Sequence, residues 1–210
     1  MQRPQRVKAP DCIETDLSGR IERIILTGFM GAGKSTVGRT LAEALRWQFL
    51  DTDDLVREAH HASPAEIFAR HGEPFFRQAE LVALTGALQQ SACVVGLGGG
   101  LLETESALPQ ILETPATLLV FLEAPPPTLF ARCCVPAAGM ARPLLGQLSE
   151  FAERYAQRLP RYRNAHLTVA TNRLTPHDVA RRIQKEIEHR ILDAAAKDAS
   201  RRTNGPDAQG

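Results

Sequence analysis

The chain has 210 residues, of which 43% are hydrophobic, and it balances 25 Lys and Arg residues against 24 Asp and Glu residues. This length suits one globular domain with a single core, and the balanced charge excludes a global field that would attract nucleic acid or an anionic membrane. No stretch approaches the roughly 18 consecutive apolar residues of a membrane-spanning helix, and the four cysteines follow neither a disulfide framework nor a zinc-site spacing. We therefore expect a cytoplasmic monomer with small-molecule ligands and with neither nucleic acid nor membrane as a partner.

Both ends of the chain have the composition of tails. Residues 1–20 lack the apolar run of a signal peptide, and residues 193–210 are mostly Ala, Ser, Asn, Gly and charged residues with no apolar period. We predict that both tails are disordered and that one folded domain spans residues 21–192.

Between the tails, short apolar runs alternate with longer segments of helical period. Two helix starts are marked by an N-cap residue, a proline at the first helical position and an acidic residue at the third, in Ser63-Pro64-Ala65-Glu66 and Thr175-Pro176-His177-Asp178. The alternation predicts an α/β fold in which helices cover both faces of a parallel sheet and ligands bind beyond the carboxyl ends of the strands. The predicted strands lie at residues 21–26, 49–50, 93–95, 117–122 and 167–170.

The first predicted strand leads directly into residues 28–36, Gly-Phe-Met-Gly-Ala-Gly-Lys-Ser-Thr, a full match to the phosphate-loop pattern G-x-x-x-x-G-K-[ST]. The backbone N–H groups of such a loop surround phosphate oxygens, and the helix that follows adds the positive end of its dipole. We expect Lys34 to reach the β and γ phosphates and Ser35 to ligate Mg²⁺. The residues expected to contact the nucleotide are Gly31, Ala32, Gly33, Lys34, Ser35 and Thr36. Because ATPases, GTPases and kinases all use this loop, the second substrate must be inferred from other residues.

Two carboxylates, Asp51 and Asp53, follow the second predicted strand. Since they are two positions apart at the carboxyl end of a strand, they project to the same side and can both face the phosphates. Asp51 can give Mg²⁺ an oxygen ligand, usually through water, and Asp53 can orient an acceptor hydroxyl and take its proton. The alternative is that Asp53 or Asp54 only caps the helix that follows.

Two further motifs are ambiguous by themselves. Arg77 and Glu80 lie three positions apart in a predicted helix, where an ion pair on a solvated face is the commoner explanation. Gly98, Gly99 and Gly100 follow the third predicted strand, and their bare backbone permits close approach of a ligand, although a simple turn would also explain them. Neither motif alone identifies a substrate.

Taken together, the motifs and their order resemble those of the shikimate kinase family. The resemblance covers about residues 21–188, and it implies a P-loop NTPase fold of the nucleoside-monophosphate-kinase type with three α/β/α layers. It also implies a lid at about residues 132–145 and a substrate-binding subdomain at about residues 53–90. The matching residues are the run 28–36, Asp51 and Asp53, Glu66-Ile67-Phe68, Gly72-Glu73-x-x-Phe76-Arg77-x-x-Glu80, Gly98-Gly99-Gly100, Arg142-Pro143-Leu144-Leu145 and Arg158-x-Pro160-x-Tyr162.

The resemblance further implies an activity and the residues that perform it. The enzyme would transfer the γ-phosphoryl group of ATP, with Mg²⁺ as cofactor, to the 3-hydroxyl of shikimate in aromatic amino-acid biosynthesis. Lys34, Asp53 and the lid residue Arg142 would be catalytic, and Arg142 would also contact the nucleotide, with Arg173 beside the adenine. Shikimate would be held by Asp53, Arg77, Gly98, Gly99, Gly100 and Arg158, with the two arginines on its carboxylate.

Two competing interpretations stay open. Another small-molecule kinase of the same fold, such as one for gluconate, would also need to hold a carboxylate, but the combination of Arg77 and Arg158 with Asp53 favours shikimate. A nucleotide-binding module that has lost catalysis is suggested by residues 133–141, which make the lid longer and more apolar than is usual in the family. An intact Lys34 argues against this second interpretation.

Overall fold

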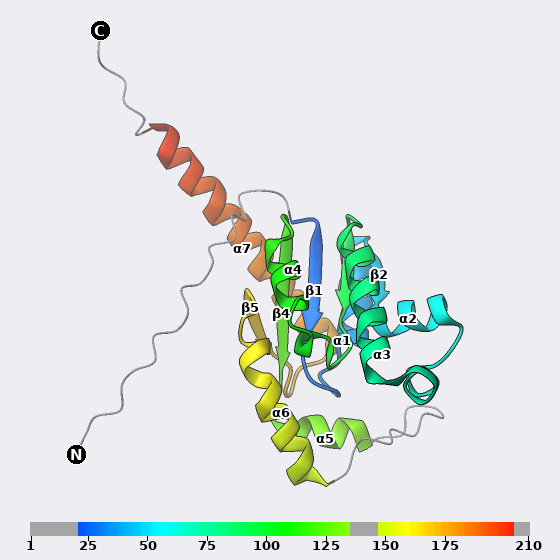
Figure 1. Ribbon diagram of the computed structural model, residues 1–210. Coiled ribbons are helices and arrows are strands. Elements are labelled where there is room, and N and C mark those ends of the chain that lie inside the picture. Colours follow the sequence, from blue (N-terminus) through cyan, green and yellow to red (C-terminus); the bar gives the residue numbers. More distant parts are fainter. Residues whose placement is uncertain (1–20, 135–146, 204–210) are drawn as a thin grey trace, which may run out of the picture.

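A computed structural model describes residues 21–134 and 147–203 of the chain (Figure 1). Its strands form one sheet in the order β2-β3-β1-β4-β5, and every neighbouring pair is parallel. The carboxyl ends of the strands therefore meet at one edge of the sheet, where the motifs predict the site. The strands are β1 (Arg23–Thr27), β2 (Gln48–Asp51), β3 (Cys93–Gly96), β4 (Thr117–Glu123) and β5 (Leu167–Ala170), each at a predicted apolar run.

Helices cover both faces of the sheet (Figure 1). On one face α1 (Lys34–Leu45) packs against α7 (Pro176–Thr203). On the other face α3 (Pro64–Leu88) packs against α4 (Ala107–Glu113). The predicted three-layer α/β/α arrangement is confirmed.

The middle strands are buried along almost their whole length because helices cover both of their faces. Ile24, Ile25 and Leu26 of β1 and Val94 and Val95 of β3 have no exposed surface, which explains why these strands are continuous apolar runs in the sequence. Burial of each such side chain contributes about 1.5 to 3 kcal/mol. The sheet is therefore a rigid support for the loops at its carboxyl edge.

Four further elements gather at the carboxyl edge of the sheet. The helix α2 (Thr52–His60) follows β2, and the 3₁₀ turn η1 (Leu101–Glu103) comes soon after β3. The helices α5 (Pro126–Cys134) and α6 (Leu148–Tyr162) pack on each other beyond β4 (Figure 1). These elements surround the place where the predicted site residues lie.

The helices α2 and α3 pack together over a small apolar cluster of their own, formed by Val56, Ala62, Ile67 and Phe76. Within α3, Gly72 leaves the helical conformation with φ 79°, so the helix is kinked before the segment that carries Arg77 and Glu80. The pair of helices spans most of residues 53–90, where the sequence predicts a substrate-binding subdomain.

Both predicted helix starts are confirmed. At α3, the Ser63 hydroxyl accepts a hydrogen bond from the backbone N–H of Glu66, and the Glu66 carboxylate accepts one from Ser63 N at 2.7 Å. At α7, Thr175 and Asp178 form the same reciprocal pair. Each capping residue satisfies a backbone N–H that would otherwise have no partner within the helix.

The last helix is longer than predicted. Composition predicts its end near Leu192, whereas α7 continues to Thr203 (Figure 1). Residues 193–197 include three consecutive alanines, which have the highest intrinsic helix propensity and need no packing surface to extend a helix that has already formed.

Several predicted segments lie outside the described residues. They are residues 1–20 and 204–210 of the two predicted tails and residues 135–146 of the predicted lid, with Arg142 among them. Within residues 21–134 and 147–203, no helix is both long enough and apolar enough to cross a membrane.

Candidate active site

The phosphate loop closes against α5 and leads into the first turn of α1. Gly33 is the N-cap of α1, and Lys34 Nζ donates a hydrogen bond to the carbonyl oxygen of Gly28 at 2.8 Å. Gly31 has φ 79°, and a Cβ on this residue would lie 2.5 Å from the carbonyl oxygen of Leu129 in α5, so only glycine fits there. The loop and the N-terminus of α1 together form an anion-binding concavity.

The remaining residues of the predicted nucleotide-binding run differ in how they can act. Ala32 is only 1% exposed, so its methyl group is packed inside the protein. Ser35 and Thr36 are exposed on the first turn of α1, so their hydroxyl groups can reach a ligand.

Ser35 and Asp51 place two hard oxygen atoms side by side. Ser35 Oγ donates a hydrogen bond to Asp51 Oδ2 at 2.8 Å. Mg²⁺ usually keeps several waters and takes only one or two protein ligands besides phosphate oxygens, so this pair has the chemistry that the ion needs. No group of three or more His, Cys, Asp or Glu side chains that could hold a metal occurs in the part of the chain that the structure describes.

The N-cap of α2 is Asp51. Its Oδ1 accepts a hydrogen bond from the backbone N–H of Asp53 at 3.1 Å. The alternative in which Asp53 or Asp54 caps this helix is therefore wrong, and the Asp53 carboxylate is available for another role.

Asp53 and Glu80 both face the backbone of Gly98. A Cβ on Gly98 would lie 2.5 Å from Asp53 Oδ1 and 2.5 Å from Glu80 Oε1, so the two carboxylates need a bare glycine. The hydroxyl of Thr52 holds the same residue, because it accepts a hydrogen bond from Gly98 N at 2.8 Å. Burial, reinforced by the charge of Asp51, raises the pKa of Asp53, which makes this carboxylate a better proton acceptor than an exposed one.

Arg77 and Glu80 form a buried ion pair rather than a pair on a solvated face. Arg77 Nη1 lies 2.7 Å from Glu80 Oε2, and the Glu80 side chain is only 2% exposed. Burial raises the pKa of Glu80 to about 7, although Arg77 acts against the shift. The guanidinium of Arg77 extends over the glycine run, since a Cβ on Gly100 would lie 2.7 Å from Arg77 Nη1.

Arg158 reaches the same glycine run from α6. Its Nη1 donates to the carbonyl oxygen of Gly99 at 3.2 Å, and the Tyr162 hydroxyl donates to the same oxygen at 2.7 Å. Glu103 Oε2 lies 2.6 Å from Arg158 Nη2 and 3.9 Å from Arg77 Nη2. The two arginines predicted to hold a carboxylate therefore converge on one point, although they come from α3 and α6.

On the nucleotide side, Arg132 joins α5 to the segment after β5. Arg132 Nη2 donates to the carbonyl oxygen of Thr171 at 2.7 Å, and its Nη1 donates to that of Gly31 at 3.4 Å. Arg173, predicted to lie beside the adenine, follows two positions later in an exposed turn with φ 60°. The turn that carries Arg173 is thus tied to the phosphate loop through Arg132.

Sequence reasoning gives no role to Thr52, Glu103 or Tyr162. The hydrogen bonds of Thr52 to Gly98 and of Tyr162 to Gly99 join residues 46 and 63 positions apart, so no local pattern predicts these contacts, although Tyr162 belongs to one of the matching motifs. The only signal for Glu103 is that it closely follows the glycine run at the carboxyl edge of the sheet.

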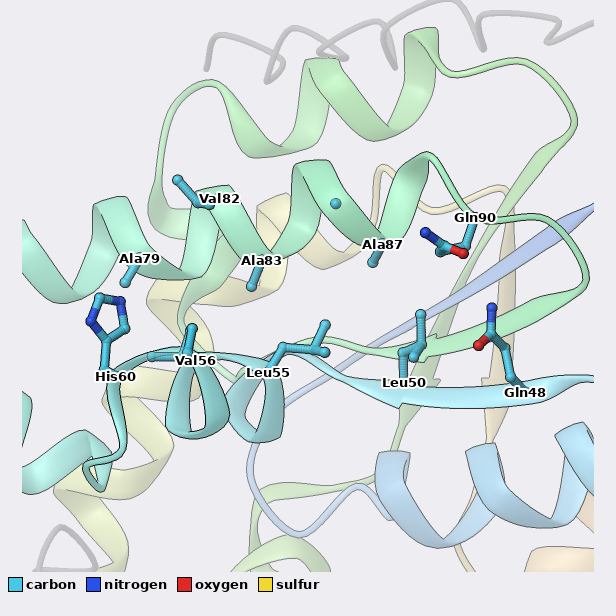
Figure 2. Close-up of a pocket in the computed structure, with 12 residues that line it drawn as sticks. Gln48, Leu50, Leu55, Val56, His60, Ala79, Val82, Ala83, Ala87 and Gln90 are labelled. Atoms are coloured by element: carbon cyan, nitrogen blue, oxygen red, sulfur yellow. The ribbon is translucent and has the colours of Figure 1, made fainter.

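A separate pocket of about 370 Å³ lies between α2, α3 and β2. Figure 2 shows Ala83 and Ala87 of α3 facing Leu55 and Leu50 across it. Its lining contains no Lys or Arg and none of the predicted site residues. Because no permanent positive charge there can offset that of a phosphate, this pocket does not suit phosphoryl transfer.

Comparison with known proteins decides between the open interpretations. A model of the shikimate kinase family matches residues 30–188. The chain belongs to the shikimate kinase family. The shikimate kinase of Chlorobium phaeobacteroides is 35% identical, over 83% of this chain and 97% of its own length, and that of Chlorobium chlorochromatii is 37% identical, over 79% and 90%. As a member of this family, the chain is an ATP-dependent kinase whose acceptor is shikimate.

Solved structures give the same result for the fold. A shikimate kinase from Acinetobacter baumannii, solved in complex with shikimate, has a TM-score of 0.74 at 32% identity and matches 82% of this chain and 96% of its own. A gluconokinase from Sinorhizobium meliloti 1021 has a TM-score of 0.60 at 21% identity, over 85% of this chain and 99% of its own. The second likeness shows a shared fold alone, so the P-loop kinase fold is confirmed and nothing favours gluconate.

Proposed function

We propose that the site at the carboxyl edge of the sheet transfers the γ-phosphoryl group of ATP to the 3-hydroxyl of shikimate, with the residues in the roles predicted above. The observation that carries the proposal is the convergence of Asp53, Arg77 and Arg158, from three different helices, on residues 98–100. Two guanidinium groups beside a carboxylate base suit an acceptor that has a carboxylate at one end and a reacting hydroxyl at the other.

On the nucleotide side, residues 31–36 bind the phosphates of ATP through their backbone N–H groups. When ATP binds, Lys34 gives up its hydrogen bond to the Gly28 carbonyl and contacts the β and γ phosphate oxygens instead. There its charge stabilises the transition state. Mg²⁺, held by Ser35 and Asp51, supplies further positive charge on the transferring phosphoryl group when it is bound.

On the acceptor side, Asp53 orients the hydroxyl and takes its proton as the phosphoryl group arrives. Arg77 and Arg158 hold the acceptor carboxylate, and each charged hydrogen bond contributes about 1.5 to 3 kcal/mol. The bare backbone of residues 98–100 lets the acceptor lie close to Asp53. This placement converts a bimolecular encounter into a reaction between aligned groups.

The remaining predicted residues complete the nucleotide site. Arg142 of the lid neutralises charge on the phosphates during transfer, and Arg173 lies beside the adenine. The enzyme acts as a cytoplasmic monomer.

The test is an assay of ADP release by purified protein with Mg²⁺ and ATP, comparing shikimate, gluconate and no acceptor. We expect release with shikimate alone, and its loss in Asp53→Asn, which keeps the size of the side chain and removes the base. The matched control is Asp54→Asn, because Asp54 instead pairs with Arg57 at 2.8 Å. Release with gluconate alone, or a fully active Asp53→Asn enzyme, would refute the proposed acceptor or the proposed base respectively.

A further inference from the structure

Glu103 occupies the space between the two arginines of the acceptor site. Its Oε2 lies 2.6 Å from Arg158 Nη2 and 3.9 Å from Arg77 Nη2. The same oxygen would lie 3.0 Å from a Cβ placed on Gly100, so it sits directly beside the glycine run. A carboxylate of the protein therefore holds the position between two guanidinium groups that the carboxylate of an acceptor needs.

Three carboxyl groups of the protein already surround the two arginines. Arg77 pairs with Glu73 at 3.0 Å and with Glu80 at 2.7 Å, in addition to the contacts that it and Arg158 make with Glu103. An incoming carboxylate would be a fourth carboxyl group beside two guanidinium groups. Since like charges a few Å apart repel strongly in a partly buried site, one of the three protein carboxylates must move when the acceptor binds.

Glu103 is the carboxylate that can leave. Glu80 is only 2% exposed and lies against Gly98, while Glu73 is 62% exposed and pairs with Arg77 along one helix. The Glu103 side chain is 41% exposed, so it has a path into solvent, and it contacts both arginines. Its departure would remove one carboxylate from both guanidinium groups in one movement.

The surroundings of Glu103 stay in place without it. Arg161 Nη1 donates to the carbonyl oxygen of Leu102 at 2.6 Å, which anchors the backbone of η1 beside Glu103. Arg158 keeps its hydrogen bond to the carbonyl oxygen of Gly99, and Arg77 keeps its buried pair with Glu80. A rotation of the Glu103 side chain alone is therefore sufficient.

We propose that Glu103 competes with the acceptor for Arg77 and Arg158: it holds both arginines in the free enzyme and is displaced when the carboxylate of shikimate binds. The inference rests on the proposed role of the two arginines. It makes Glu103 a specificity-determining residue, because a small anion that offers only charge gains too little to displace it, whereas shikimate adds contacts through its hydroxyl groups.

The variant Glu103→Gln tests the competition, since it keeps the shape and one acceptor oxygen but removes the charge. We expect the Kd of shikimate, measured by calorimetry on the full chain, and its KM in the ADP-release assay to fall about two- to tenfold, with kcat changed less than about twofold. The matched control is Glu105→Gln, which removes the same charge from an exposed residue two positions further on. This control should leave Kd, KM and kcat unchanged.

An acceptor without a carboxylate separates competition from a general loosening of the site. A shikimate analogue with a hydroxymethyl group in place of the carboxylate should bind the wild-type chain and Glu103→Gln equally. If the KM of shikimate in Glu103→Gln is unchanged or higher, or if the analogue gains as much affinity as shikimate, Glu103 does not compete and the inference fails. A wild-type chain that does not phosphorylate shikimate would instead refute the proposed function, so the two failures are distinguishable.

Discussion

The nucleotide half and the acceptor half of this active site are built in different ways. Most of the proposed nucleotide half is one continuous run, residues 28–36, whose backbone we expect to bind the phosphates and which Asp51 joins through a single side-chain hydrogen bond. The acceptor half is assembled from side chains of α2, α3, η1 and α6 over residues 98–100. The first half is set by local geometry and the second by tertiary contacts, so substitutions in each should affect different kinetic constants.

The largest expected effect is in the nucleotide half, at Lys34. Lys34→Met keeps the length of the aliphatic chain and removes the charge that stabilises the transferring phosphoryl group. We expect kcat to fall by about 10² to 10³, the usual loss when one preorganised donor is removed, with the Kd of shikimate unchanged. Measurement is by ADP release and by calorimetry with shikimate.

Lys185→Met is the matched control for this change, because Lys185 is exposed on α7. It should retain wild-type kcat. If Lys34→Met instead weakened shikimate binding as much as it lowered kcat, the two halves of the site would not be independent.

This contrast also explains how much could be predicted from the sequence. The loop before α1 was predictable because its conformation follows from the order of adjacent residues, and the middle strands were predictable because burial on both faces leaves continuous apolar runs. Arg77, by contrast, was ambiguous until the structure showed that Glu80 is buried. The contacts of Glu103 and Tyr162 could not be predicted, because their partners are brought near only by the fold.

The next largest effect is expected at Arg158, in the acceptor half. Arg158→Lys keeps the positive charge but replaces a planar fork by a point charge, so it cannot hold a carboxylate and the Gly99 carbonyl in the same geometry. We expect the KM of shikimate to rise about ten- to a hundredfold, with little change in the KM of ATP. Steady-state kinetics with each substrate varied in turn measures both values.

The control for this substitution is Arg181→Lys on the exposed surface of α7, which should leave both constants as they are. An equal rise in the KM of ATP for Arg158→Lys would contradict the separation of the two halves.

A smaller effect concerns stability and pH at Glu80. The pKa of this carboxyl is about 7 in the folded chain against 4.5 for the ordinary group. Between these pH values the unfolded chain has lost the proton and the folded chain has kept it, so this residue makes the free energy of unfolding fall as pH rises from about 4.5 to about 7. The loss is on the order of 1 to 3 kcal/mol.

Urea unfolding at pH 5 and pH 8 tests this expectation. Glu80→Gln cannot ionise, so its stability should fall less than that of the wild-type chain between the two values. Glu73→Gln removes another carboxylate that pairs with Arg77, at the surface of the same helix, and should keep the wild-type dependence. Identical pH dependence in Glu80→Gln and wild type would mean that Glu80 is ionised in the folded chain throughout this range.

The smallest expected effect is at Tyr162, whose hydroxyl holds the Gly99 carbonyl at 2.7 Å while its ring stacks on Phe121 at 5.2 Å. Tyr162→Phe removes the hydrogen bond and keeps the stacking. Because Arg158 still donates to the same carbonyl, we expect a loss of about 1 kcal/mol in the free energy of unfolding. The rise in the KM of shikimate should stay below about tenfold, with the KM of ATP unchanged.

Tyr162→Leu provides the comparison, since it removes the ring as well as the hydroxyl and should cost at least about 2 kcal/mol more in the free energy of unfolding. If the hydroxyl matters only for packing, Tyr162→Phe will lower stability without any change in the KM of shikimate. If it also positions the Gly99 backbone for the acceptor, stability and the KM of shikimate will change together. In either case a shift confined to the KM of ATP would contradict the assignment of Tyr162 to the acceptor half.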